Sequence, residues 1–376
     1  MSYKILHFSD LHLDASFAGQ GFSVEYGRER RLDLRAALTR IFAHARELKV
    51  NVVTISGDLF TQEYLLPETA DFIQQQLSML SPIRVVIAPG VHDPYTNESP
   101  YARLNWPENV DIFYQGKLTH LELKPDIHLW GACNPPARGH KLLEGFQPKK
   151  GINILLLHAI QGGNSNEIHS ISLEAVQKAG FQCALLGGDH NSNILPSEKP
   201  LMIYPGSVEP LTPAEENVQH QVVVLEVDGE SINAQSLSLQ QWHYAAVKVD
   251  LTHCTSIAEA ANRVNAALEI AVSKAPKSVV TVALTGQPPA DLNVAGLQGL
   301  IQSPVFYRLE SQFGLNFDLD QLAREQTVRG LLVQHFLGRI HKASNETERS
   351  QHLTALNFAL QALEGKQVSL YEIKTA

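Results

Sequence analysis

The chain has 376 residues, of which 44% are hydrophobic and 18% charged, with 30 Lys and Arg against 39 Asp and Glu. This composition excludes an intrinsically disordered chain and is typical of a folded globular protein. The net charge of -9 excludes a protein that binds nucleic acid with its whole surface, so an anionic ligand must be met by a local basic patch or a bound cation. A length above the about 250 to 300 residues at which a single core stops growing predicts two domains, or one domain with an appended arm.

The cysteines and the start of the chain indicate a reducing compartment. Cys133, Cys183 and Cys254 form no CxxC pair, so we expect neither a disulfide framework nor a thiolate zinc site. No apolar run reaches the about 18 residues of a membrane span, and the first ten residues lack the basic stretch and apolar core of a signal peptide. We therefore expect a cytoplasmic protein that does not bind membranes.

Strand-length apolar segments alternate with helical patterns in the first half of the chain, which is the rhythm of an α/β layered fold. Apolar residues at helical spacing predict one helix over 34–48 and another over 73–80, in a segment opened by Pro67. The strands are predicted, in chain order, at 4–9, 51–56, 83–88, 152–157 and 183–186. The helices should cover the sheet.

The second half changes pattern twice. Edge-like strands follow residue 201, and the sheet is expected to close near Leu239. The next predicted elements are a strand at 245–250, an amphipathic helix over 256–274, a strand at 278–285, a short helix from Leu292, and two amphipathic helices after Thr327. We therefore predict a first domain over 1–240, a small α+β capping domain over 241–318 and a helical C-terminal arm over 319–376, which packs on the body or on a partner.

Acids and histidines gather where the predicted strands end. They are Asp10, His12, Asp58, His92, His158 and His190. In an open α/β sheet, ligands bind beyond the carboxyl ends of the strands, so these side chains should converge on one site. Carboxylate and imidazole without thiolate suit Mn²⁺, Fe²⁺ or Zn²⁺.

This ordered series resembles the calcineurin-like metallophosphoesterase superfamily, whose pattern is DxH, GD, GNHD, H and GHxH. The order and strand context match over about residues 4–207. Within that superfamily, the segments ILHFSDLHLD, NVVTISGDLF and YPGSVEPL look like the DNA-repair exonuclease branch of SbcD and YhaO type. The resemblance implies a four-layer α/β/β/α sandwich for the first domain.

The resemblance also implies roles for the matching residues. Asp10, His12 and His190 would hold a first metal ion, Asp58 would bridge two ions, and His158 would serve the second. His92 would protonate the leaving oxygen or stabilise the transition state. The ions, Mn²⁺ by resemblance, would clamp the phosphate and activate a water for in-line attack.

Two departures fall on the second ion. The GNHD motif appears here with Val91 in place of Asn, and the GHxH motif with Gly188 in place of its first His. Asp93 or Asp189 could be recruited instead, although Asp189 is also a typical turn residue. We expect one well-held ion and a second that is weak, substrate-dependent or absent.

A basic cluster follows the first motif. Arg28, Arg30 and Arg31, with Arg35 just beyond, could meet phosphate and steer nucleic acid to the site, or could line a solvated helix face.

The sequence thus predicts a Mn²⁺-dependent phosphoesterase that hydrolyses DNA. By resemblance, its C-terminal helices would contact an SMC-like ATPase of SbcC type, and a homodimer is also open. The losses at Val91 and Gly188 favour an alternative, a catalytically impaired subunit that binds DNA or scaffolds an ATPase. A small-molecule phosphodiesterase or phosphatase would keep the same metal site.

Overall fold

The computed structural model describes residues 2–134, 142–162, 168–195, 200–275, 277–286, 292–312 and 319–363. The chain forms two compact units, a first unit of Met1–Ala245 and Ala275–Val279 and a second of Ala246–Lys274 and Val280–Ala376. The three-domain division at 240 and 318 stays a prediction, and residue 318 lies outside the described residues. Within the described ranges, every helix is too short or too polar to cross a bilayer.

Two sheets form the first unit. The first has the order β13-β12-β1-β2-β3-β4 and the second β10-β11-β9-β7-β6-β5, with β8 paired to β7. The first contains β1 (Tyr3–Phe8), β2 (Val52–Ile55), β3 (Arg84–Ile87), β4 (Val110–Ile112), β12 (Val222–Asp228) and β13 (Ser231–Leu237). The second contains β5 (Thr119–Lys124), β6 (Ile127–Gly131), β7 (Ile152–Gln161), β8 (His169–Ile171), β9 (Cys183–Gly187), β10 (Asn193–Leu195) and β11 (Leu201–Tyr204).

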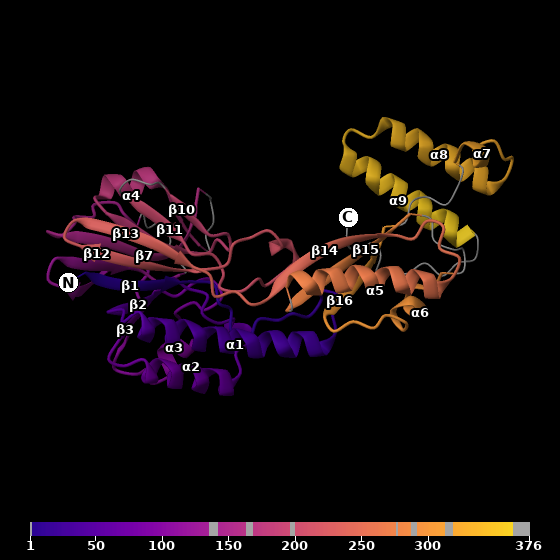
Figure 1. Cartoon of the computed structure of the whole chain (residues 1–376). Coiled ribbons are helices and arrows are strands. Elements are labelled where there is room, and N and C mark those ends of the chain that lie inside the picture. Colours follow the sequence, from indigo (N-terminus) through magenta and orange to yellow (C-terminus); the bar gives the residue numbers. More distant parts are fainter. Residues whose placement is uncertain are drawn as a thin grey trace. The chain divides into compact units, whose positions relative to one another are not determined.

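The sheets face each other across an apolar core. Ile5 and Val86 of the first sheet belong to the same buried cluster as Leu129, Ile154 and Leu185 of the second. The helices α1 (Val24–Glu47), α2 (Pro67–Met79) and α3 (Pro100–Arg103) lie over the outer face of the first sheet, and α4 (Leu173–Ala179) over that of the second (Figure 1). The predicted four-layer α/β/β/α sandwich is confirmed.

Local sequence explains where the long helices begin. The Ser23 side chain accepts a hydrogen bond from the Tyr26 N–H and so caps α1, whose buried face includes Leu34, Leu38 and Ile41. Pro67 opens α2, where its missing N–H costs nothing. Each helix carries its apolar residues to one face, which covers the sheet.

The second unit contains the remaining elements. The sheet β14-β15-β16 is formed by β14 (His243–Asp250), β15 (Ser278–Thr285) and β16 (Phe306–Ser311), and the helices are α5 (Ile257–Lys274), α6 (Val294–Gln298), α7 (Leu319–Leu322), α8 (Val328–Lys342) and α9 (Glu346–Leu363). Val264 and Leu268 of α5 share a buried cluster with Val280 and Val282 of β15. The predicted strands and helices of this half are confirmed, and Val333, Leu356 and Leu360 form a separate small core that joins α8 to α9.

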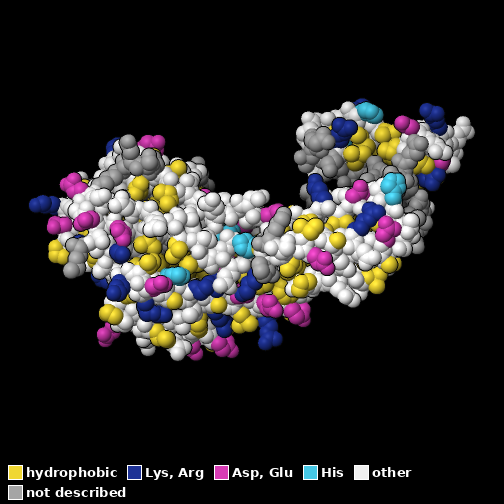
Figure 2. Space-filling model, in the orientation of Figure 1, with side chains coloured by type: hydrophobic (Ala, Val, Ile, Leu, Met, Phe, Trp, Pro, Cys, Tyr) yellow, Lys and Arg dark blue, Asp and Glu magenta, His cyan; other side chains and the backbone are white. Residues whose placement is uncertain are grey.

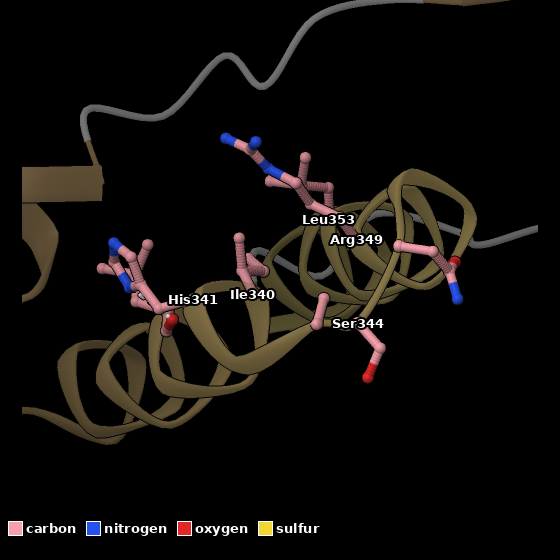
Figure 3. A pocket seen from close by; sticks show the side chains of 8 residues that line it. Ile340, His341, Ser344, Arg349 and Leu353 are labelled. Carbon is pink, nitrogen blue, oxygen red and sulfur yellow. Dashed lines mark hydrogen bonds between the residues drawn. The ribbon is translucent and has the colours of Figure 1, made fainter.

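A pocket opens where α8 turns into α9. Its lining includes Ile340, His341, Ser344, Arg349 and Leu353 (Figure 3). The described lining holds no carboxylate and one imidazole, whose Nδ1 donates to the Leu337 carbonyl. This pocket therefore offers no set of metal ligands, and the chemistry must be sought in the first unit.

Candidate metal centre

The loops that follow β1 and β2 are joined by backbone hydrogen bonds. The Asp10 N–H donates to the Gly57 carbonyl at 3.1 Å, and the His12 N–H to the Asp58 carbonyl at 2.9 Å. Asp10, His12 and Asp58 adopt left-handed backbone angles, with φ of 53°, 50° and 53°. Such angles cost free energy for residues with a side chain and persist only where the surroundings enforce them. Bringing these three side chains together thus has a cost in folding free energy.

All six strand-end residues predicted from the sequence meet at this place. Three overlapping groups each have ligand atoms within 4.8 Å of one another: Asp10, His12 and His190; His12, Asp58 and His92; and Asp10, Asp58 and His158. Four of the six are buried, His190 is half-buried and His92 is exposed. The groups share members, so the side chains form one centre. Their individual roles stay predictions.

The donor atoms fit a divalent cation. Asp58 Oδ2 lies 3.6 Å from His12 Nε2 and 3.5 Å from His158 Nε2. The buried His12 Nε2 has no hydrogen-bond partner among the described residues, although an unpaired buried nitrogen is costly. Asp58 Oδ1 is occupied by the His92 N–H at 2.8 Å, which leaves Oδ2 directed at the two imidazoles. A cation between these atoms would satisfy the orphaned nitrogen.

Hydrogen bonds set the orientation of two imidazoles. His158 donates from Nδ1 to the Ser56 carbonyl at 3.0 Å, and His190 from Nδ1 to Glu215 Oε1 at 3.3 Å. Each bond keeps the proton on Nδ1 and turns Nε2 toward the centre, as metal-binding histidines require.

Burial and neighbouring charges shift the pKa values of the side chains in the centre. Burial lowers the pKa of His12 to about 3, so its imidazole is neutral and its lone pair is available to a metal. Burial works against the charged form of Asp58 as well, but the nearby His158 and His12 hold the pKa of that carboxyl below its usual range. Burial would lower the pKa of His190, yet the hydrogen bond to Glu215 and the charge of Asp10 raise it to about 9.

Asp93 holds the Asp58 loop. Its Oδ1 accepts the N–H groups of Asp58 at 2.9 Å and Gly90 at 2.6 Å, and its Oδ2 accepts the Leu59 N–H at 2.8 Å and the Tyr101 hydroxyl at 2.7 Å. Burial and the charge of Asp58 raise the pKa of Asp93 to about 7. The suggestion that Asp93 is recruited as a replacement ligand is wrong for this structure, because both of its oxygens are engaged. A Cβ at Gly90 would lie 2.2 Å from Asp58 Oδ1, so the loop needs glycine there.

The second departure from the family motif is also explained by space. Gly188 has φ of 96°, and a Cβ there would lie 2.8 Å from Ile168 Cδ1 and 3.1 Å from His158 Nε2. Its N–H donates to Asp10 Oδ2 at 3.1 Å. Asp189 caps the turn instead, since its Oδ1 accepts the Asn191 N–H at 2.9 Å, as expected for a turn residue. Val91 is half-buried and supplies no ligand atom.

The basic cluster does not act as one surface. Arg28 is exposed and Arg31 half-buried, whereas Arg30 is fully buried. The Arg30 guanidinium lies 5.4 Å from the ring centroid of Phe17 and 4.8 Å from that of Trp242. The prediction that Arg30 binds substrate is therefore wrong, because aromatic packing removes its charge from solvent. For Arg28 and Arg31 it stays a prediction.

Sequence reasoning missed the supports of the centre. Glu215 lies in the short helix η2 (Pro213–Glu215), 25 residues from its partner His190. His7 lies beneath the centre, where its Nδ1 pairs with Thr54 Oγ1 and its Nε2 with the Leu186 carbonyl. Glu215 lies in no recognisable motif, and although His7 lies in the segment ILHFSDLHLD, that segment does not reveal its contacts with Thr54 and Leu186. The strand β7 also continues to Gln161, so His158 lies within a strand rather than at its end.

Comparison with known proteins agrees with this arrangement. A family model described as calcineurin-like phosphoesterase matches residues 3–177. The uncharacterized metallophosphoesterase YhaO of Bacillus subtilis is 26% identical over 222 residues, which cover 54% of this chain and 52% of the relative. The match thus spans about half the length of that curated relative.

Two solved structures are similar at low identity. TT1561 of Thermus thermophilus is 14% identical with a TM-score of 0.39, covering 63% of this chain and 99% of that chain. A dimetal phosphatase from Danio rerio is 14% identical with a TM-score of 0.39, covering 63% and 98%. The family match over residues 3–177 and the YhaO likeness show that the first unit is similar to calcineurin-like phosphoesterases, and the clustered ligands agree with that similarity.

Proposed function

We propose that the first unit is a metal-dependent phosphodiesterase that hydrolyses DNA, with Mn²⁺ as the ion. The single observation that carries the phosphoesterase part is the convergence of six carboxylate and imidazole side chains into three overlapping ligand groups. Carboxylate oxygen and imidazole nitrogen suit Mn²⁺, Fe²⁺ and Zn²⁺. DNA as substrate and Mn²⁺ as the ion rest on the likeness of the sequence to the DNA-repair exonuclease branch.

The chain's own residues would divide the chemistry as follows. A bound divalent ion would neutralise charge on the phosphate and activate a water for in-line attack. Asp10, His12 and His190 would hold one ion, and Asp58 would turn Oδ2 toward both positions. His92 is exposed and its ring centroid lies 5.0 Å from that of His12, which supports a role in giving a proton to the leaving oxygen.

Contact with DNA would be local. On the face shown in Figure 2, Lys and Arg side chains are interspersed with Asp and Glu. A mixed surface on a chain with a net charge of -9 supports contact through the bound ion and a few cations such as Arg28 and Arg31.

The C-terminal helices would bind a partner, an SMC-like ATPase of SbcC type. Val328 and Leu331 of α8 are 73% and 65% exposed, although α8 and α9 have a small core of their own. Apolar side chains left in solvent on a packed helix pair are typical of interaction surfaces.

A second function is favoured by Val91 and Gly188. A subunit that has lost ligands for the second ion could bind DNA or scaffold an ATPase without cleaving. The φ of 96° at Gly188 would be strained for the family's His, and a Cβ there would lie 3.1 Å from His158 Nε2.

The test combines metal content with hydrolysis. Purified full-length protein is loaded with Mn²⁺, its ion content is measured by mass spectrometry, and it is assayed on bis(p-nitrophenyl) phosphate and on single- and double-stranded DNA. Mutation of a residue that hydrogen-bonds a metal ligand lowers activity by up to about 100-fold. Asp58→Asn changes a ligand itself and should lower the rate of hydrolysis by more than that. Asp71→Asn, an exposed acid of α2, is the matched control and should hydrolyse like the unaltered protein.

The outcomes separate the proposals. Hydrolysis of the small diester without cleavage of DNA would overturn the DNA assignment. Bound ion without hydrolysis of either substrate, alone or with an ATPase partner, would favour the scaffold.

A further inference from the structure

We infer that Glu215 is a positioning residue for the metal ligand His190, and this inference rests on the proposed metal-dependent function. Glu215 Oε1 accepts the Nδ1–H of His190 at 3.3 Å and the Thr212 hydroxyl at 3.2 Å. The Glu215 side chain is itself 10% exposed. A carboxylate behind a histidine fixes its tautomer, orients the ring and makes its Nε2 a stronger ligand.

The second oxygen of Glu215 is held just as firmly. Oε2 accepts the Leu211 N–H at 3.1 Å and the Ser207 hydroxyl at 3.2 Å. Ser207 Oγ lies 2.9 Å from Nδ1 of the buried His220, which therefore donates to it while Ser207 donates onward to Glu215. Each oxygen of Glu215 thus accepts two hydrogen bonds, and these four bonds hold the carboxylate in one place.

The same segment also anchors the backbone of His190. The Ser207 N–H donates to the His190 carbonyl at 3.2 Å, and a Cβ at Gly206 would lie 2.7 Å from that carbonyl oxygen. Ser207 also pairs with Ser9, the residue before Asp10. Residues 206–215 thus hold the main chain and the ring of His190 against the loop that carries Asp10 and His12.

The other imidazoles of the centre have weaker supports. His158 Nδ1 donates to a neutral backbone carbonyl, and His12 Nδ1 lies 3.5 Å from the Thr61 hydroxyl. A hydrogen bond to a charged acceptor is about twice as strong as one between neutral groups. Among the described residues, His190 is the ligand of this centre whose distal nitrogen meets a carboxylate.

A double-mutant cycle on Mn²⁺ affinity tests this inference with the full-length protein. Affinity is measured by titration calorimetry for the unaltered protein, Glu215→Gln, His190→Ala and the double variant. Removing a support of this kind typically weakens metal binding about 10 to 100-fold. We expect at least a tenfold loss from Glu215→Gln alone and less than a twofold further loss in the His190→Ala background, because the support then has no ring to hold.

Two further variants keep the test decisive. Glu216→Gln changes the neighbouring exposed acid and should leave Mn²⁺ affinity unchanged. Should Glu215→Gln fail to fold, Ser207→Ala removes one donor to Oε2 and should give a smaller loss, again only when His190 is present.

The inference is overturned by an equal loss in both backgrounds, which indicates a purely structural role, or by a Glu215→Gln affinity within twofold of the unaltered protein. Absence of Mn²⁺ binding in the unaltered protein overturns the inference together with the metal assignment. Binding with the expected coupling but without hydrolysis supports the inference and defeats only the proposed enzymatic function.

Discussion

The two halves of the metal centre share Asp58 but differ in what they retain. The His190 half contains Asp10, His12 and His190, and the carboxylate of Glu215 stands behind one of its rings. The His158 half contains His158, and the two other positions that the family motif fills with ligands are Val91 and Gly188. Hydrogen bonds hold the loops of both halves, so the halves differ in their ligand atoms and in the carboxylate behind His190.

This contrast teaches that ligand loss need not disturb a metal centre's scaffold. Gly188 still donates its N–H to Asp10, and Asp93 still holds the N–H groups of Asp58, Leu59 and Gly90. The strained loops of the centre are therefore held by hydrogen bonds even though Val91 and Gly188 supply no ligand side chain. We expect the His190 half to bind the first ion tightly and the His158 half to bind the second weakly.

The largest expected effect separates the halves directly. His12→Ala removes a member of two ligand groups and should weaken Mn²⁺ binding by more than about 100-fold. His158→Ala should weaken the tight binding event less than about tenfold, because it removes a ligand of the weaker position. Equilibrium dialysis with Mn²⁺ measures both, and His44→Ala on α1 serves as a control. Equal losses from the two ligand variants would contradict the asymmetry.

A second prediction concerns the residue that holds the shared ligand. Asp93→Ala leaves three N–H groups of the Asp58 loop without an acceptor, and each such loss costs about 1 to 3 kcal/mol. We expect the free energy of unfolding to fall by about 3 kcal/mol or more in urea denaturation. Tyr101→Phe removes one donor to Asp93 and should cost only about 1 kcal/mol. A similar cost for both variants would show that Asp93 does not organise the loop.

A third prediction attempts to repair the weaker half. Val91→Asn restores an amide oxygen at the family position and should raise bound Mn²⁺ from about one ion toward two per chain, measured by mass spectrometry. Val91→Ala is the control, because it makes room without a donor. Gly188→His should instead destabilise the fold, since φ of 96° is strained by about 1 to 3 kcal/mol for a side-chain-bearing residue. Equal ion content in the Asn and Ala variants would refute the repair.

The sequence predicted those parts of the site that depend on local pattern. Predicted strands that are followed by Asp, Gly or His place these side chains at one edge of a sheet, so the six converging residues could be named in advance, although His158 lies within β7 rather than at its end. The strands β4 to β6 were missed, and β5 shows why: its segment THLELK alternates charged and apolar residues, and all of its residues lie partly or fully exposed at the edge of the sheet.

Features that depend on distant partners could not be predicted. Arg30 looks like Arg28 and Arg31 in residue type, but it lies one turn before Leu34 on the buried face of α1, and Phe17 and Trp242 pack around its guanidinium. Glu215 is one of many acids, and its role follows from a contact with a residue 25 positions away. The residues that support a site depend on tertiary contacts, which the sequence does not reveal. Ligands at strand ends can be predicted because the strands themselves are recognisable in the sequence.

The smallest expected effect concerns His7, a buried histidine of β1 that is not a member of the ligand groups. Burial lowers the pKa of His7 from its ordinary 6.5 to about 4, against smaller opposing effects of its hydrogen bonds to Leu186 and Thr54. Between pH 4 and 6.5 the unfolded chain therefore binds a proton that the folded chain rejects, so this residue's contribution to stability rises with pH and is lost as pH falls below 6.5. Removing the imidazole in His7→Gln should flatten the slope of unfolding free energy against pH by up to about 1.4 kcal/mol per pH unit in that window. Thr54→Val, which removes a hydrogen-bond partner of His7 but keeps the imidazole, should lower stability and preserve the slope. Identical slopes for His7→Gln and the unaltered protein would mean that the pKa of His7 is the same in the folded and unfolded chains. That result would contradict the burial of an uncharged His7 imidazole in the folded protein.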